Sequence, residues 1–508
     1  MESLGEEPWD VVICGTGLSQ SLLALALSRS KKRILHLDPN DFYGEHEAAF
    51  SLQEADNWAA ANAGLTTGDE STKETQNIFK NASVWKHPEA ADHGLSFPRA
   101  YSLALAPQII HTRSKLLEQL VSSRAYRQVE FLAVGSFFVY DENASPKLAR
   151  IPSSREDVFA TRSIPVKSKR SLMKFLKFVI EYDSDEQKSV WQGQESKPLS
   201  EFLASEFKLD ENLQKYILAL TLTLDGNVTV ADGLATIHRH LTSMGLFGPG
   251  FCAVYPKWGG SSEIAQVACR AGAVGGGIYM LDTKAKVKDG SDGNEITLDL
   301  SNDLSVKTTK LVKSQSEAAP GSQTSTRLIA VVNSPLQTLF EVTTEGGPSP
   351  AVAVVAFPAG SSTGAEDSTS SNNPIYALVH SSETGECPVG QSVIYLTSLS
   401  TSQSAQQLET ALNSLLAAAA HAKGSTPICL YKVQYEQSLS AREPSCTTNG
   451  SVRTFAFPSR SLSLAFDDSC LAAVKDAWKL VMGDETPEDE YMIFEDREGM
   501  AEDDDAYD

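Results

Sequence analysis

The first forty residues constrain the fold of this chain more than any other segment. A short apolar run at residues 9–14 ends at the tight turn Gly15-Thr16-Gly17, and a Leu- and Ala-rich stretch at residues 19–30 follows. A second apolar run, Ile34–Leu37, ends in an acid, Asp38. Strand, glycine turn, helix and strand in this order predict a β-α-β unit, and therefore a parallel sheet.

The glycine turn is an incomplete dinucleotide-binding motif. In G-x-G-x-x-G the third glycine allows close packing of helix on strand, beside a pyrophosphate at the helix N-terminus. Here the three positions are Gly15, Gly17 and Gln20, with Asp38 placed where an acid could hold a ribose hydroxyl. A glutamine side chain crowds the site, so we predict a Rossmann-type fold that binds no cofactor. A flavin-dependent oxidoreductase stays open as the alternative.

Charge separates the end of the chain from its body. The 508 residues have a net charge of −22, and thirteen acidic residues with a single Arg lie within residues 484–508. Such a segment predicts a disordered acidic tail over residues 483–508. The negative balance also argues against nucleic acid as a partner and against a purely electrostatic hold on anionic membranes.

Cysteine and histidine spacing gives no sign of a metal centre or a catalytic site. The seven cysteines are scattered without a C-x-x-C pair, which predicts reduced thiols and a cytoplasmic protein. His238 and His240 are two residues apart on one expected helix and point to different faces, so we expect no metal there. Hydrolase, zinc-protease and P-loop motifs are lacking, and no apolar run approaches the ~20 residues of a membrane span. No catalytic constellation is therefore evident in the sequence, and only the fold supports a flavin oxidase.

Periodicity along the rest of the chain predicts an inserted helical domain. Apolar residues recur at helical spacing within residues 103–225, with a β-hairpin at residues 129–152. This domain interrupts an α/β domain formed by residues 1–102 and 226–482. Residues 284–326, rich in Ser, Thr, Lys and Asp, are expected to be a loop or linker. The fold class is thus α/β, with a Rossmann-type sheet domain, a mostly helical insertion and an acidic tail.

Two blocks of sequence resemble the Rab escort protein / Rab GDP-dissociation inhibitor superfamily. The first combines G-T-G-L at residues 15–18, L-H-L-D at residues 35–38 and Tyr43-Gly44. The second runs from Tyr255-Pro-Lys-Trp-Gly-Gly through residues 276–281. The resemblance implies an FAD-enzyme-like fold that carries out no redox chemistry.

The escort branch of this superfamily is the more similar one, because residues 151–159 and 169–178 look like the escort-protein segment. The resemblance implies that Tyr43, Glu263 and Arg270 bind GDP-bound Rab GTPases, unprenylated and prenylated. It also implies that Phe159 and Arg170 contact the Rab geranylgeranyltransferase heterodimer. A packing role is the alternative for Tyr43 and Phe159, and a surface charge for Glu263 and Arg270.

The resemblance implies a non-catalytic accessory component of Rab geranylgeranyltransferase. Such a protein presents Rab for prenylation, shields the geranylgeranyl lipid and delivers the product with transient membrane contact. A Rab GDP-dissociation inhibitor that recycles prenylated Rabs is the alternative. Five apolar residues of the expected helices are candidates for a prenyl pocket, although each also suits an ordinary core: Leu116, Leu120, Phe175, Val179 and Leu220.

Overall fold

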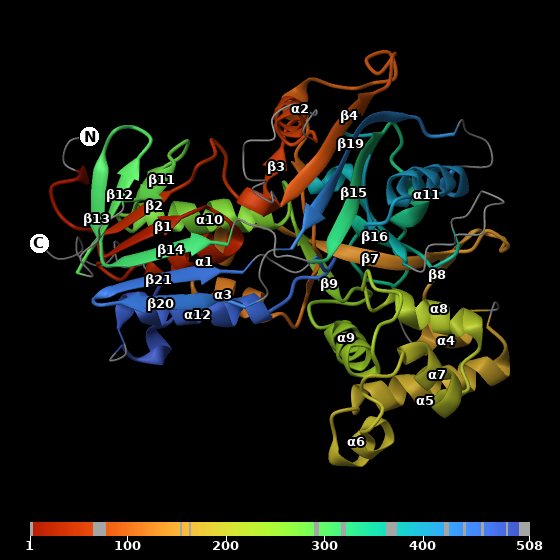
Figure 1. Ribbon diagram of the computed structural model, residues 1–508. Helices are drawn as coiled ribbons and strands as arrows, with labels where there is room; N and C mark the ends of the chain where they lie inside the picture. Colours follow the sequence, from red (N-terminus) through yellow and green to blue (C-terminus); the bar gives the residue numbers. More distant parts are fainter. Residues whose placement is uncertain are drawn as a thin grey trace, which may run out of the picture.

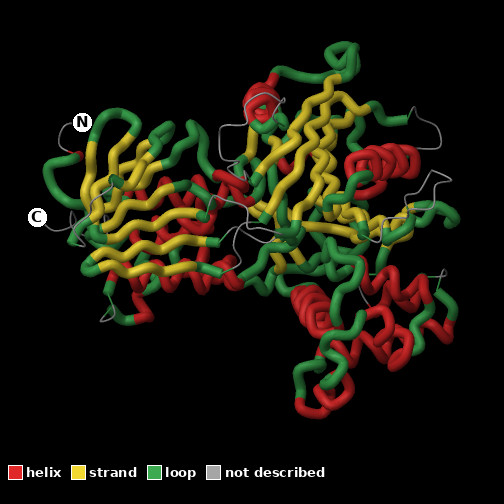
Figure 2. The backbone as a smooth tube through the Cα atoms, viewed as in Figure 1, coloured by secondary structure: helices red, strands yellow, loops and turns green. Residues whose placement is uncertain are grey.

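The chain forms a Rossmann-type sheet, a larger mixed sheet beside it, and a layer of helices below the larger sheet (Figure 1). The computed structural model describes residues 4–64, 78–152, 155–161, 164–288, 294–315, 322–361, 373–420, 426–439, 443–458, 462–483 and 486–496. Figure 2 shows the two sheets in yellow, with helices against both.

The predicted β-α-β unit is present at the N-terminus. It consists of β1 (Val11–Cys14), α1 (Leu18–Leu27) and β2 (Ile34–Leu37), and β1 pairs in parallel with β2. The strand order of the sheet is β10-β2-β1-β14-β21-β20, with β1 next to β14 on its other side. The remaining strands are β10 (Ile278–Met280), β14 (Lys310–Ser314), β20 (Ser445–Asn449) and β21 (Val452–Phe457).

Alternate residues of β1 enter two different cores. Val11 and Ile13 pack with α1, α10 (Ser261–Val274) and α12 (Ser469–Met482), whereas Val12 packs on the opposite face. That face is covered by a three-stranded sheet of β11 (Ala285–Val287), β12 (Ile296–Leu300) and β13 (Ser305–Thr308). Side chains of successive strand residues point to opposite faces, so a strand this short still contributes to two cores.

The expectation of a loop over residues 284–326 is therefore wrong for its described part. That part holds β11, β12, β13, β14 and the start of β15. In β12 the residues Ile296, Leu298 and Leu300 are buried and the two between them are half-buried. Because polar residues alternate with the apolar ones on these short strands, the composition of the segment concealed its sheet pattern.

The larger sheet has the order β4-β19-β15-β18-β17-β16-β7-β9-β6, and β8 pairs with β7. Helix α11 (Ser404–Ala419) packs on one face, and α2 (Leu52–Ala61) lies at the other face. The strands are β4 (Phe79–Lys86), β6 (Ile110–His111), β7 (Phe131–Tyr140), β8 (Leu148–Arg150), β9 (Ala253–Pro256), β15 (Thr324–Val332), β16 (Val352–Phe357), β17 (Ile375–Ser381), β18 (Ser392–Leu399) and β19 (Cys429–Ser438). The hairpin predicted at residues 129–152 is β7 and β8.

The helical layer starts and ends later in the chain than predicted. It runs from α4 (Arg155–Ala160) to α9 (Val230–Ser243), whereas the prediction was residues 103–225. The earlier residues join the sheets, because β7 pairs with β16 and β9, and α3 (Lys115–Ser122) packs in the Rossmann core. The other helices of the layer are α5 (Val166–Ile180), α6 (Asp185–Trp191), α7 (Leu199–Phe207) and α8 (Glu211–Ala219).

The prediction of a disordered tail does not hold for residues 486–496. Tyr491, Met492 and Phe494 are buried in the core that contains α1, α3 and α12. The Phe494 N–H donates to the Ser122 carbonyl at 3.0 Å. Three large apolar side chains among the acids supply the burial that a purely acidic segment lacks. Residues 497–508 lie outside the described residues.

Two predictions about the whole chain can be compared with the structure directly. The seven cysteines form no disulfide bonds in the structure. Among the described residues, no helix has the length and apolar character needed to cross a bilayer.

Candidate functional site

The turn that would cradle a dinucleotide is filled by the chain's own side chains. Glu45 begins the short helix η2 (Glu45–Glu47), and its carboxylate lies over the turn between β1 and α1. A Cβ added at Gly15 would clash with Glu45 Oε1, and one added at Gly17 would lie 2.7 Å from Oε2. Ser314 Oγ donates to Glu45 Oε2 at 2.8 Å. The carboxylate therefore occupies the place that a pyrophosphate takes in dinucleotide-binding proteins.

Asp38 and Gln20, the other two positions of the incomplete motif, also form hydrogen bonds within the chain. Asp38 Oδ2 accepts hydrogen bonds from the N–H and the Oγ1 of Thr16, both at 2.7 Å, and so binds its own chain. The Gln20 side chain is buried against the turn and hydrogen-bonds to Ser314. Glu47 Oε2 accepts from the Leu18 N–H at 3.4 Å, at the first residue of α1.

These residues do not fit a bound dinucleotide. Burial, and secondly the charge of Asp38, raise the pKa of Glu45 to about 8. A pyrophosphate would have to displace the Glu45 side chain, which is already hydrogen-bonded to Ser314, and would be repelled by the nearby carboxylate of Glu47. We therefore derive no cofactor chemistry from this site.

The three residues expected to bind Rab lie around α10. Glu263 and Arg270 are seven residues apart on this helix, which places them on one face two turns apart. Glu263 is half-buried, which raises the pKa of its carboxyl, and Arg270 is exposed. Tyr43 is half-buried, and its pKa is raised by burial and then by Cys269 of α10 and Asp38. The Tyr43 hydroxyl thus lies close to the helix that carries the other two side chains.

Trp258 adjoins this group, and the sequence analysis did not single it out as a site residue. Its side chain is 52% exposed, and its φ of 73° is left-handed. The turn containing it packs on the strand that follows the Tyr43 loop, because a Cβ on Gly259 would lie 2.5 Å from Ala49 Cβ. A large exposed aromatic side chain on a fixed turn is typical of a binding surface. The sequence feature that could have identified Trp258 as a binding residue is its position in the motif Tyr255-Pro-Lys-Trp-Gly-Gly.

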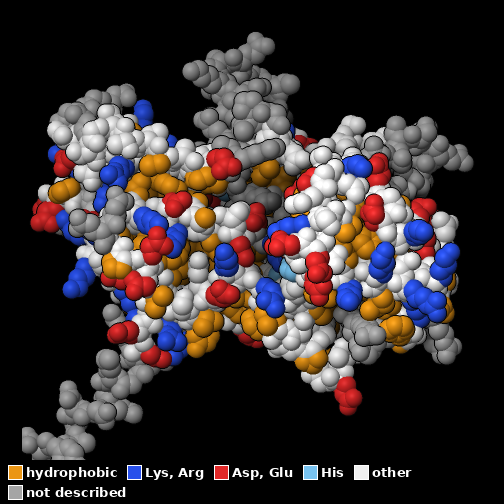
Figure 3. Space-filling model, turned by 90° about the horizontal axis from the view of Figure 1, so that it is seen from below, with side chains coloured by type: hydrophobic (Ala, Val, Ile, Leu, Met, Phe, Trp, Pro, Cys, Tyr) orange, Lys and Arg blue, Asp and Glu red, His pale blue; other side chains and the backbone are white. Residues whose placement is uncertain are grey.

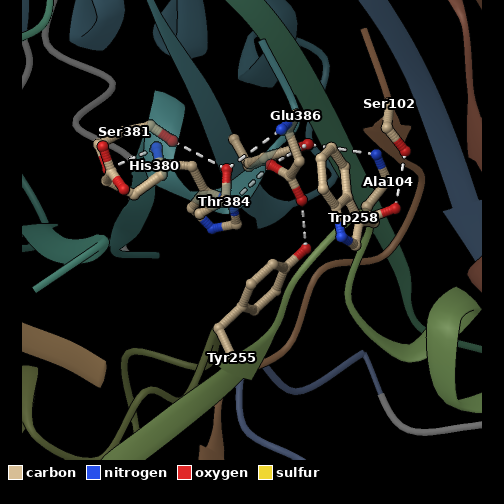
Figure 4. A network of polar contacts seen from close by, with 10 residues as sticks. Ser102, Ala104, Tyr255, Trp258, His380, Ser381, Thr384 and Glu386 are labelled. Atoms are coloured by element: carbon tan, nitrogen blue, oxygen red, sulfur yellow. Dashed lines mark hydrogen bonds and ion pairs between the residues drawn. The ribbon is translucent and has the colours of Figure 1, made fainter. Parts of the chain in front are cut away.

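A buried carboxylate next to the Trp258 turn holds this region together (Figure 4). Glu386 is fully buried and accepts from Tyr255 Oη at 2.7 Å and Tyr395 Oη at 2.9 Å. His380 Nδ1 lies 2.7 Å from Glu386 Oε2, the oxygen that also accepts from Tyr395. Burial, together with the charge of Glu386, raises the pKa values of both tyrosines well above their usual range. The cluster joins β9, β17 and β18 of the larger sheet.

The same cluster positions the Trp258 backbone. The Trp258 N–H donates to the Thr384 carbonyl at 2.9 Å, and Ser102 Oγ donates to the Trp258 carbonyl at 2.8 Å. The indole ring lies on Gly385, which has a φ of +75° and no room for a Cβ. The conformation of the turn is therefore set by residues more than 100 positions away, which no local pattern could reveal.

Phe159 and Arg170 lie on neighbouring helices at the surface of the helical layer. Phe159 on α4 is 56% exposed and Arg170 on α5 is exposed. Lys169 Nζ donates to the Phe159 carbonyl at 2.8 Å and to the Thr161 carbonyl, which fixes the end of α4 against α5. The alternative of a core role for Phe159 is thus wrong. Figure 3 looks onto this side of the molecule, where basic side chains (blue) alternate with apolar ones (orange).

The five prenyl-pocket candidates do not line one cavity. Leu116 and Leu120 belong to the Rossmann core, and Leu220 to the core under the larger sheet. Phe175 and Val179 lie in the separate core of the helical layer. All five are packed at 5% exposure or less, and helical periodicity alone could not show which core each enters.

A cavity of about 840 Å³ lies between the β7–β8 hairpin and helices of the layer. Its wall contains Ile164, Leu213 and Tyr216 together with charged groups such as Asp157 and Lys215. None of the five candidates forms part of this wall.

Comparison with known proteins identifies relatives of the chain. Residues 5–67 and 66–343 match the family described as GDP dissociation inhibitor. The chain is 30% identical over 395 residues to "Rab proteins geranylgeranyltransferase component A" of Saccharomyces cerevisiae, which covers 76% of this chain and 61% of the relative. It is 28% identical over 305 residues to "Rab escort protein 1" of Arabidopsis thaliana, over 54% of each. The matched part of the chain thus covers 61% of the length of the first relative and 54% of the length of the second.

A solved structure shows the same fold. The Rab GDI of Plasmodium falciparum superposes with a TM-score of 0.63 over 93% of this chain and 98% of its own, at 18% sequence identity. The Rossmann-type fold predicted from the glycine turn agrees with this similarity.

Proposed function

The chain belongs to the GDP dissociation inhibitor family, and we propose that within this family it acts as a Rab escort protein. The observation that carries this proposal is the match to component A of Rab geranylgeranyltransferase over 76% of the chain. In this role the chain catalyses nothing itself. It binds a GDP-loaded Rab and brings it to the transferase heterodimer.

We propose the face around α10 as the Rab-binding surface. Arg270 supplies an exposed guanidinium, and Glu263 supplies a carboxylate in the first turn of α10, five residues after Trp258. Charge-assisted hydrogen bonds from such groups are about twice as strong as neutral ones. Tyr43 and Trp258 add aromatic contact area at little cost in side-chain entropy. The intramolecular contacts of Glu45 and the Glu386 cluster would hold both aromatic residues in place before binding.

We propose the α4–α5 surface as the docking site for the transferase. Phe159 offers an apolar side chain that is already exposed, and Arg170 is an exposed residue of α5 that follows Lys169, the residue hydrogen-bonded to the Phe159 carbonyl. An aromatic anchor next to an arginine is the combination that dominates binding energy in many interfaces. The two surfaces lie on different parts of the molecule, so both partners can bind at once.

The decisive experiment is a prenylation assay with purified components. Unprenylated Rab, the transferase and labelled geranylgeranyl diphosphate are incubated with and without this chain, and label on Rab is counted. An escort protein will raise the rate strongly. No stimulation, together with intact Rab binding in a pull-down, would refute the escort role.

The second candidate is a Rab GDP-dissociation inhibitor, which the structural similarity to a Rab GDI favours. It would extract prenylated Rab from membranes without supporting prenylation. Both roles require shielding of the lipid, since each buried CH₂ contributes about 0.8 kcal/mol and twenty carbons need a dry site in the cytosol. Release of prenylated Rab from liposomes, measured beside the prenylation assay, separates the two roles. We propose a cytoplasmic location with transient membrane contact in either case.

A further inference from the structure

Three side chains that commonly bind metals meet where the helical layer joins the larger sheet. His111 ends β6, His240 lies on α9, and Cys252 directly precedes β9. Their ring nitrogens and Sγ lie within 4.8 Å of one another, and each side chain is at most 3% exposed. The residues come from positions up to 141 apart, so the fold alone assembles the group.

Hydrogen bonding within the protein does not satisfy this group. Neither ring nitrogen of His111 has a partner, although the ring is fully buried. Cys252 Sγ lies 3.5 Å from His240 Nδ1, and a thiol is a weak donor and acceptor. A buried polar atom without a partner costs about 1–3 kcal/mol, and such atoms are rare in native proteins. Both ring nitrogens of His111 are such atoms, and they lie beside the Cys252 thiol, which indicates that this group binds a ligand.

We propose that His111, His240 and Cys252 form a binding site for one thiophilic metal ion, with Cu⁺ preferred over Zn²⁺. Imidazole and thiolate are the ligands that both ions accept. With one thiolate, Cu⁺ gives a neutral centre, whereas Zn²⁺ leaves an uncompensated positive charge in a buried site. Arg239, which follows His238 and precedes His240, adds positive charge nearby and further favours the monovalent ion.

The protonation states of the three groups are compatible with metal binding. Burial lowers the pKa of His240 to about 4 and that of His111 well below its usual value, so both rings are neutral ligands at pH 7. Burial raises the pKa of Cys252 to about 12. The metal must therefore displace the thiol proton, which leaves to solvent as the metal–sulfur bond forms.

A metal ion here would link α9 to the strand pair β6–β9. Hydrogen bonds already align these elements: the Thr112 N–H donates to the Cys252 carbonyl at 2.9 Å, and Thr112 Oγ1 donates to the Ser243 carbonyl at 2.6 Å. The ion would strengthen the connection between the helical layer and the sheet. This inference does not depend on the proposed escort role.

The test is a titration of the reduced, metal-free chain of 508 residues with Cu⁺ against the competing chelator bathocuproine disulfonate. We expect one equivalent to bind and the midpoint of thermal unfolding to rise. Cys252→Ala should abolish both effects, and His111→Gln should weaken binding at least tenfold. Cys269→Ala, at another buried thiol, and Cys446→Ser, at an exposed one, should bind like the wild type.

The outcomes divide clearly. Copper binding that survives in Cys252→Ala, or no binding of either Cu⁺ or Zn²⁺ to the wild type, would overturn the proposal. One equivalent of Zn²⁺ that is lost in Cys252→Ala, without copper binding, supports the site and overturns the preference for copper. Since Cys252→Ala removes a buried thiol, its circular dichroism is compared with that of Cys269→Ala, and His111→Gln gives an independent answer if Cys252→Ala does not fold.

Discussion

At the scale of single residues, the carboxylate of Glu45 does what a bound phosphate does in related folds. It accepts from Ser314 and covers the glycine turn. Its folded-state pKa of about 8 lies above the 4.5 of an unfolded chain. A group whose pKa is raised by folding stabilises the folded state fully below pH 4.5, and this contribution is lost as the pH rises through 8.

We therefore expect Glu45→Gln to stabilise the chain at high pH. At pH 8.5 the variant avoids the cost of a buried negative charge, and its free energy of unfolding should exceed that of the wild type by about 1–3 kcal/mol. At pH 5 the difference should shrink toward zero. Urea unfolding at both pH values measures this. The control is Glu206→Gln, an exposed glutamate on α7, which should change little at either pH.

The Glu386 cluster gives a second prediction at this scale. Tyr255→Phe removes one of the hydroxyl donors to a buried carboxylate, so the chain should lose about 1–3 kcal/mol of stability. The change is read by urea unfolding, and the fluorescence of Trp258 should report a looser turn. Tyr126→Phe, at an exposed tyrosine, is the matched control. Equal loss in both variants would contradict a special role for the cluster.

At the scale of helices, the two proposed surfaces predict that two substitutions will each weaken the binding of a different partner. Phe159→Ala on α4 should weaken transferase binding by tenfold or more and leave Rab binding unchanged, because its side chain is exposed and not part of a core. Arg270→Ala on α10 should do the reverse. Each variant is the control for the other, and pull-downs with each partner measure both.

A further control keeps this prediction specific. Ile180→Ala removes an equally exposed apolar side chain at the far end of α5 and should affect neither partner. If Phe159→Ala reduced binding of both partners, or lowered the unfolding temperature much more than Ile180→Ala, the α4–α5 surface would not be a docking site.

At the scale of the whole molecule, the C-terminal segment belongs to the fold. Tyr491, Met492 and Phe494 cover the core around Trp478, and Arg127 pairs with Asp496. A chain truncated after residue 485 should therefore lose about 4.5–9 kcal/mol, the approximate value of burying three such side chains. A chain truncated after residue 496 keeps these three side chains and is the control, which should retain this part of the stability. Thermal and urea unfolding of both truncations, at equal concentration, measure the difference.

Local sequence determined the elements whose pattern is complete within a few residues. The β1–α1–β2 unit and the β7–β8 hairpin follow from apolar periodicity and turn residues, so they could be predicted from the chain alone. The same holds for the crowding of the glycine turn by Gln20. Motif similarity indicated the family and the residues expected to face the partners, and the roles of those residues stay predictions.

Only the tertiary structure decided what depends on contacts between distant residues. In the folded chain Glu45 lies over the glycine turn, and side chains of three strands contact Glu386 or one another around it. The five candidates for the prenyl pocket lie in three different cores. The tertiary structure also ordered residues 486–496, because the apolar surface that holds Tyr491 and Phe494 comes from α1, α3 and α12. Burial is a property of the assembled chain, and a sequence pattern shows that a side chain is apolar without showing which surface will cover it.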